Sequence, residues 1–160
     1  LPSNSREQFF IILRSLLDAR LYGGKSNLKF ALEHLMKMTK RRSLLIVISD
    51  FITLENNWEE PLKVAKEKFD IIMIILRDKR DEVLPINIGK VVISDPYSKK
   101  QLIVDPDSIA KEYEEFNKIR KSYLIHTFKK YGLDFIDMKT DEDFTILFLK
   151  ILKRREMELA

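Results

Sequence analysis

The short segment YGGKSN at residues 22–27 places two glycines, a lysine and a serine directly before a segment with helical periodicity. This composition resembles the end of a phosphate-binding loop, whose glycine-rich turn presents backbone amides to phosphate at a helix N-terminus. The complete motif begins with another glycine and follows a strand. In the window ARLYGGKS, Ala19 takes the place of that glycine, and the preceding residues have helical spacing. The sequence therefore does not predict a nucleotide site here.

A hydroxyl and a carboxylate nevertheless stand at positions where a cation could bind. Ser26 begins a predicted helix, and Asp50 ends the apolar run SLLIVISD. Both are hard oxygen donors, the type that Mg²⁺ or Mn²⁺ prefers, either directly or through water. On spacing alone, the simpler interpretation is a helix cap and a strand-end aspartate that bonds loop amides. The metal interpretation needs further support.

Other common catalytic patterns are absent from the sequence. The chain has no cysteine, and its two histidines, His34 and His126, lie in separate predicted helices without a metal-ligand partner. No HExxH or GxSxG motif occurs. The basic KRR stretches at 40–42 and 153–155 lack the interleaved aromatic residues of a single-strand binder, so we interpret them as solvated helix ends. We therefore predict no catalytic residues and no nucleic-acid partner.

Length and composition indicate one globular domain that spans residues 1–160. The formal net charge is +4, and the absence of cysteine is typical of a reducing compartment, so we expect a cytoplasmic protein. The apolar runs are far shorter than the roughly 20 residues of a membrane span. The first residues lack the features of a signal peptide, and the chain begins with leucine, which suggests a piece of a longer protein.

In the first half of the chain, helical and strand patterns alternate. Asn4 and Glu7 predict a capping box for a first helix that ends near Leu21, before two glycines. Ser26 or Asn27 caps a second helix, which fades at residues 39–42. The continuous apolar run at 43–51 predicts a strand buried on both faces. A short helix at 57–68 and a second buried strand at 70–78 follow.

The second half predicts a hairpin, a long helix, a strand and a last helix. Two short apolar runs, KVVIS and QLIVD, flank the turn DPYSKK. A helix from about 107 to 131 ends at Gly132, LDFIDM forms a third strand, and Thr140, followed by Asp143, caps the last helix. The order predicts an α/β fold with a mainly parallel sheet. Its carboxyl edge, where ligands of such sheets bind, carries Ser49, Asp50, Arg77, Asp78, Lys139, Thr140 and Asp141.

Four stretches in order, GGKSNLKFALEHL, RRSLLIVISDF, LPINIGKVVISDPYSKKQLIVD and GLDFIDMKTDEDFTILFLKIL, cover nearly the whole chain. Together they resemble the carboxyl-terminal part of domain-of-unknown-function family 58. Members of that family are bacterial and archaeal proteins with a von Willebrand factor A-like domain, often encoded beside MoxR-like AAA ATPases. The resemblance implies a Rossmann-like, three-layer fold with a metal-ion-dependent adhesion site at the carboxyl edge of the sheet.

The resemblance also implies which residues take part in that site. Ser26 matches the usual threonine of the GGT motif, and Asp50 matches the aspartate of the SDF motif. The Asp-x-Ser-x-Ser loop that supplies most of the ligands is absent from residues 1–160. The domain therefore resembles one that lacks its first strands. We expect an open edge along the strand that ends at Asp50, covered by a second copy, a swapped element or an absent segment.

These observations lead to two functional hypotheses from different classes. The first is a non-enzymatic protein-protein interaction module that assists a MoxR-like AAA ATPase in complex assembly or maturation, with an incomplete site in which Ser26 and Asp50 hold Mg²⁺ or Mn²⁺ weakly. The alternative is a metal-dependent phosphoesterase that uses Asp50, Asp78 and Asp141, which requires these carboxylates to converge. Binding of nucleic acid by the basic helix ends is a third, weaker interpretation.

Overall fold

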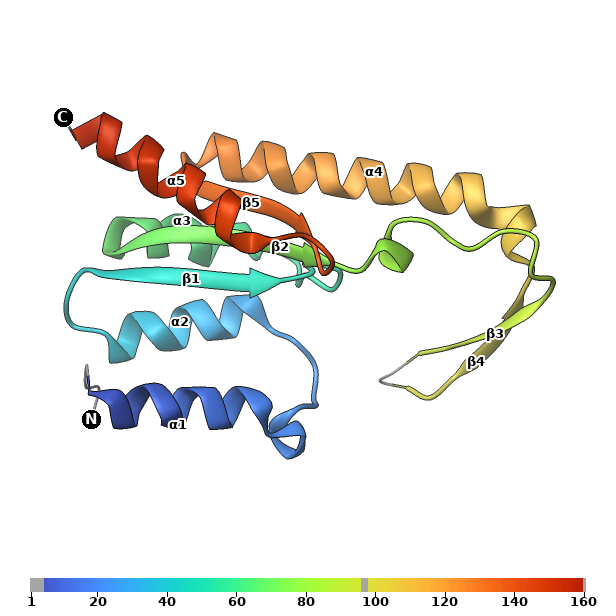
Figure 1. Cartoon of the computed structure of the whole chain (residues 1–160), viewed down its shortest axis with the longest axis horizontal. Helices are drawn as coiled ribbons and strands as arrows, with labels where there is room; N and C mark the ends of the chain where they lie inside the picture. Colours follow the sequence, from blue (N-terminus) through green and yellow to red (C-terminus); the bar gives the residue numbers. More distant parts are fainter. Residues whose placement is uncertain (1–4, 96–97, 160) are drawn as a thin grey trace.

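The computed structural model describes residues 5–95 and 98–159, and it has the predicted alternation of helices and strands (Figure 1). The helices are α1 (Arg6–Leu17), α2 (Leu28–Met38), α3 (Glu59–Lys68), α4 (Pro106–Lys130) and α5 (Phe144–Leu159), with short 3₁₀ helices η1 (Ala19–Leu21) and η2 (Lys79–Asp81). The strands are β1 (Ser43–Ser49), β2 (Phe69–Arg77), β3 (Val91–Ser94), β4 (Gln101–Val104) and β5 (Asp134–Lys139).

Three of the strands form a parallel sheet in the order β1-β2-β5. Ser43 pairs with Phe69 at one end of β1, and Arg77 pairs with Lys139 at the end of β5. Strands β3 and β4 form a separate antiparallel hairpin, which lies beyond the end of the sheet in Figure 1. Pro96 and Tyr97 of the predicted turn lie outside the described residues. The predicted α/β class and the hairpin are confirmed.

The two faces of the sheet are covered to different extents. Helices α2, α3 and α4 cover one face, where a main core contains Phe69, Ile71, Met73 and Ile75 of β2. Helix α5 covers the other face over β2 and β5, where a smaller core contains Ile72, Ile136, Met138 and Ile151. This alternation along β2 is the period of two that a strand buried on both faces requires.

Strand β1 departs from the prediction that both of its faces are buried. Leu45 and Val47 pack against the main core. On the opposite face, Leu44, Ile46 and Ile48 have exposed fractions of 54%, 41% and 62%. These residues pair with the part of β2 that α5 covers, so the apolar α5 face of the sheet continues uncovered onto β1.

Helix α1 is also more exposed than its apolar spacing predicts. None of its residues is buried, and its exposed apolar side chains include Phe9, Ile12 and Leu16. The predicted cap Asn4 lies outside the described residues, and Ser5 is the N-cap, with its hydroxyl accepting from the amide of Gln8. The helix ends at Leu17, four residues before the predicted end. The physical reason is Asp18, which caps η1 instead of continuing α1.

The ends of the last two helices follow from local turn chemistry. Gly132, with a φ of 63°, ends α4 in the left-handed conformation that glycine adopts without strain. The predicted cap of α5 needs a correction: the Asp143 carboxylate accepts from the amide of Thr145, while the Thr140 hydroxyl donates to Asp78. In the described part of the chain, no helix is both long enough and apolar enough to cross a membrane.

Candidate functional site

The carboxyl ends of β1, β2 and β5 meet at one edge of the sheet, as the sequence predicts for parallel strands. Asp50 follows β1, Asp78 follows β2 and Thr140 follows β5. The predicted edge residues therefore lie at neighbouring strand ends. Whether these residues can bind a cation depends on the hydrogen bonds that each of them already makes.

The turn after β1 holds Asp50 in a fixed position. Phe51 has a φ of 52°, a conformation that costs a bulky residue of the order of 1–3 kcal/mol. Its buried ring packs edge-on against Phe128, with 5.6 Å between the centroids. The Ser49 hydroxyl accepts from the amide of Phe51 at 3.0 Å, and the Asp50 carboxylate accepts from the amide of Ile52 at 2.9 Å. The exposed Asp50 carboxylate is thus oriented by its own backbone.

The Arg77 side chain connects the end of β2 to this turn through a hydrogen bond. Its side chain lies on the main-core face, is only 1% exposed, and donates from Nε to the Asp50 carbonyl oxygen at 3.0 Å. The sequence placed Arg77 at a strand end but assigned no role to it. The signal was present in the alternation along IIMIILR, which places Arg77 on the same face as the buried Met73 and Ile75.

Ser26 does not cap α2, because Asn27 does. The Asn27 side chain accepts from the amide of Phe30 at 2.7 Å. The Ser26 hydroxyl lies instead 2.8 Å from the Thr53 hydroxyl and 3.3 Å from the Thr53 carbonyl oxygen. The loop before α2 is therefore bonded to the β1–α3 loop three residues after Asp50. Among the described residues, no hydrogen bond joins Ser26 to Asp50.

A cavity of about 520 Å³ lies beside Ser26, and it is lined by Lys25, Ser26, Thr53, Leu54, Glu55, Asp95 and Ser98. Its wall thus includes two hydroxyls that bond each other and residues of the β3–β4 hairpin. Hydroxyl and carboxylate oxygens suit a hard cation, and Mg²⁺ commonly binds through one or two carboxylates while it keeps several waters. The donors fit such an ion in type, but this chain offers few of them.

The strand-end carboxylate of Asp78 serves local structure. Asp78 accepts from the amide of Arg80 at 2.9 Å and caps η2, and the Thr140 hydroxyl donates to it at 3.4 Å. Residues 5–95 and 98–159 contain no group of three or more acidic, histidine or cysteine side chains placed to hold a metal ion. Asp50, Asp78 and Asp141 therefore do not form such a group, and no observation favours the phosphoesterase alternative.

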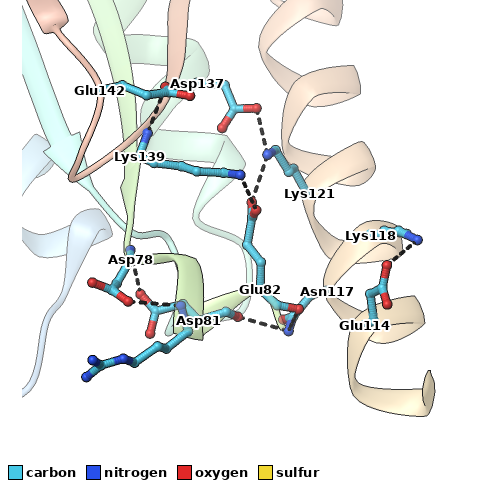
Figure 2. A network of polar contacts seen from close by, with 11 residues as sticks. Asp78, Asp81, Glu82, Glu114, Asn117, Lys118, Lys121, Asp137, Lys139 and Glu142 are labelled. Atoms are coloured by element: carbon cyan, nitrogen blue, oxygen red, sulfur yellow. Dashed lines mark hydrogen bonds and ion pairs between the residues drawn. The ribbon is translucent and has the colours of Figure 1, made fainter. Parts of the chain in front are cut away.

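A charged network ties the η2 segment to α4 and β5 (Figure 2). The Lys121 ammonium lies 2.8 Å from carboxylate oxygens of both Glu82 and Asp137, and Lys139 lies 3.8 Å from Glu82. The Asn117 amide donates to the Asp81 carbonyl oxygen at 2.9 Å. The hydrogen bond from Lys121 and the nearby positive charges lower the pKa of Glu82. These contacts hold the end of β2 in place beneath α4.

The second basic stretch is engaged in ion pairs at the opposite edge of the sheet. Arg155 bonds both carboxylate oxygens of Asp70, at 2.7 and 2.8 Å, and it also bonds Asp134. Arg154 pairs with Asp134 as well. The structure thus supports a structural role for these arginines, in which they attach α5 to the amino ends of β2 and β5.

The sequence profile of the family described as "Protein of unknown function DUF58" matches residues 2–122. Uncharacterised proteins of Mycobacterium tuberculosis (Rv1480) and Mycobacterium bovis (Mb1516) are each 26% identical over 141 residues, 86% of this chain and 44% of theirs. An uncharacterised Mycobacterium avium protein (MAV169) is 24% identical over 135 residues, 83% of this chain and 78% of its own length. The chain thus spans less than half of the first two relatives. No solved structure matches it. Because the profile covers more than half of the chain, the chain belongs to the DUF58 family.

Proposed function

We propose that this chain is part of a non-enzymatic protein-protein interaction domain, in which a divalent cation at the carboxyl edge of the sheet helps to bind a partner. The observation that carries the proposal is the exposed Asp50 carboxylate beside the loop that Ser26 and Thr53 join. These oxygens lie at the edge where α/β sheets bind ligands. Ser26 and Asp50 would hold Mg²⁺ or Mn²⁺, and an acidic partner side chain would add a further oxygen ligand.

A MoxR-like AAA ATPase is the partner that the resemblance to von Willebrand factor A-like domains suggests. In this proposal the ATPase engages the domain to assemble or mature a protein complex. The uncovered apolar face of β1 supports an interaction role, because exposed apolar surface on a sheet marks a contact surface. The open edge of β1 offers a second route to association, through a further copy of the chain that pairs along this strand.

The test is a binding measurement between the protein and a purified MoxR-like AAA ATPase. We expect affinity in Mg²⁺ to exceed affinity in a chelator, and we expect Asp50→Asn and Ser26→Ala to remove that difference. Asp141→Asn is the matched control, because it removes an exposed strand-edge carboxylate outside the Ser26–Asp50 pair. Binding that is equal with and without metal, and equal in all variants, would contradict the metal-dependent interaction.

A further inference from the structure

Arg77 is a buried cation whose outer nitrogen atoms have no hydrogen-bond partner. Its Nε donates to Asp50, but Nη1 and Nη2 are buried without an acceptor among the described residues. A buried charge normally has a partner, and an exception requires an explanation. The site described above uses only the Nε atom of Arg77. Its two remaining nitrogen atoms thus offer donors that no described group of the chain accepts.

Arg120 on α4 presents a second unpartnered guanidinium nitrogen close to Arg77. The Arg120 Nε is buried without an acceptor. Arg77 bonds the carbonyl oxygen of Asp50, and the next residue, Phe51, lines the same cavity as Arg120, so the turn after β1 connects the two arginines. Burial and then the positive charge of Arg77 lower the pKa of Arg120. Asp50 and Asp81 act on Arg120 in the opposite direction, yet among the described residues neither forms an ion pair with Arg77 or Arg120. Both guanidinium groups are thus associated with the turn after β1.

A cavity of about 330 Å³ lies between the β1–α3 loop and α4, and Arg120 lines it. Its lining combines apolar side chains, among them Phe51, Trp58 and Leu124, with the polar side chains of Glu55, Asn56, Asn57, Arg120 and Tyr123. Phe51 is also the residue whose strained backbone the turn maintains. Arg120 lines the cavity, whereas Arg77 is buried and does not line it. A group that reaches both arginines must enter past Arg120.

We propose that Arg77 and Arg120 form an oxyanion site, which takes a carboxylate or a phosphate group. The planar guanidinium fork matches both groups, and an anion held by both forks would be neutralised by two positive charges. An oxyanion would give the unpartnered nitrogen atoms their acceptors and would remove the repulsion between the arginines. This site uses other side chains than the proposed cation site, which uses those of Ser26 and Asp50, although Leu54 and Glu55 line the cavities beside both. It goes beyond the proposed function.

Glu55 is the competitor for these arginines within the chain. It lines the same cavity, and both of its carboxylate oxygens are buried without a hydrogen-bond partner. In the structure it pairs with neither arginine. If Glu55 were their counter-ion in solution, added anions would bind only after its charge is removed. Glu55→Gln therefore decides between an internal pair and an anion site.

The test is a nuclear magnetic resonance titration that follows the Nε–H signals of both arginines. Sodium phosphate and sodium acetate are added in separate arms, with sodium chloride keeping the ionic strength constant. We expect saturable shifts of Arg77 and Arg120 in the native chain. Saturation by both anions assigns the site to carboxylates as well as phosphates, and saturation by phosphate alone assigns it to phosphoryl groups. Failure of both anions to saturate overturns the proposal.

Variants separate this site from general attraction to a basic surface. Arg77→Met should weaken anion binding roughly tenfold or more, because hydrogen bonds to charged groups are lost. Arg120→Met should do the same if Arg77→Met fails to fold. Arg80→Met is the matched control, since it removes an exposed arginine three residues away, and its affinity should stay unchanged. Equal affinity in Arg77→Met or Arg120→Met, or binding that appears only in Glu55→Gln, overturns the proposal.

Discussion

The uncovered face of β1 makes a quantitative prediction about self-association. Leu44, Ile46 and Ile48 each leave roughly half of the side chain in water. Full burial of such a side chain contributes about 1.5–3 kcal/mol, so burying the exposed half contributes about 1 kcal/mol each. Replacing all three with threonine, which keeps the preference for a strand, should weaken association by about 3 kcal/mol, or roughly a hundredfold in dissociation constant.

The assay is sedimentation velocity over a concentration series of the native chain and the triple variant. We expect the native chain to self-associate through the uncovered face of β1, and we expect the variant to be dissociated at concentrations where the native chain is still associated. Val47→Thr is the control on the same strand, because Val47 packs inward against the main core. It should lower the free energy of unfolding and leave association unchanged. A native chain that sediments as a monomer at every concentration would refute the reasoning.

Three further predictions concern individual contacts. Arg155→Met should lower the free energy of unfolding by about 2 kcal/mol, measured by urea denaturation, because it leaves the carboxylate of Asp134, whose side chain is 16% exposed, with fewer partners. Glu82→Gln should flatten the pH dependence of stability between about pH 5 and 3. The pKa of Glu82 lies below its ordinary 4.5. The pair between Glu82 and Lys121 therefore contributes its full stabilisation above pH 4.5, and this contribution is lost as the pH falls through the lowered pKa. Calorimetry should show only weak Mg²⁺ binding to this chain, because Ser26 and Asp50 together supply a single carboxylate.

Each of these predictions has a matched comparison. Lys153→Met removes an exposed cation on α5 and should leave unfolding by urea unchanged, so an equal loss would contradict the ion-pair argument. Glu114→Gln breaks an exposed pair with Lys118 one helical turn away, and its acid unfolding should match that of the native chain. Tight Mg²⁺ binding with a fixed stoichiometry would show that the donor set in this chain is larger than Ser26 and Asp50.

Local patterns were sufficient to predict most elements of the fold. The positions of β2 and α4 follow from an apolar run and from helical spacing that ends at Gly132, both of which depend on nearby residues. The β3–β4 hairpin followed from two short apolar runs and a turn. The predictions of helix N-caps were less accurate, because several polar residues near one helix start can accept the same backbone amides. At α5, Asp143 accepts the amide, while Thr140 is drawn to Asp78.

The sequence did not predict which residues are buried or which hydrogen bonds the site residues make, because both depend on residues distant along the chain. A continuous apolar run such as β1 shows that both faces are apolar, but it does not show that an element covers each face. Ser26 and Asp50 were predicted at the correct edge, yet the hydroxyl bond from Ser26 to Thr53 joins two loops. The burial of Arg77 likewise requires the turn after β1 and the helix α4 to be in place.

The open edge of β1 and the proposed cation site are next to each other, and this makes them interdependent. A further parallel strand along β1 would lie about 4.8 Å away, with its carboxyl end beside Asp50. The turn after that strand would then add donors where Ser26 and Asp50 offer too few. Because Phe51 and Arg77 hold the Asp50 turn rigidly, the incoming strand must fit the existing geometry. We therefore expect reciprocal coupling: metal strengthens pairing along β1, and pairing along β1 strengthens metal binding by the same factor.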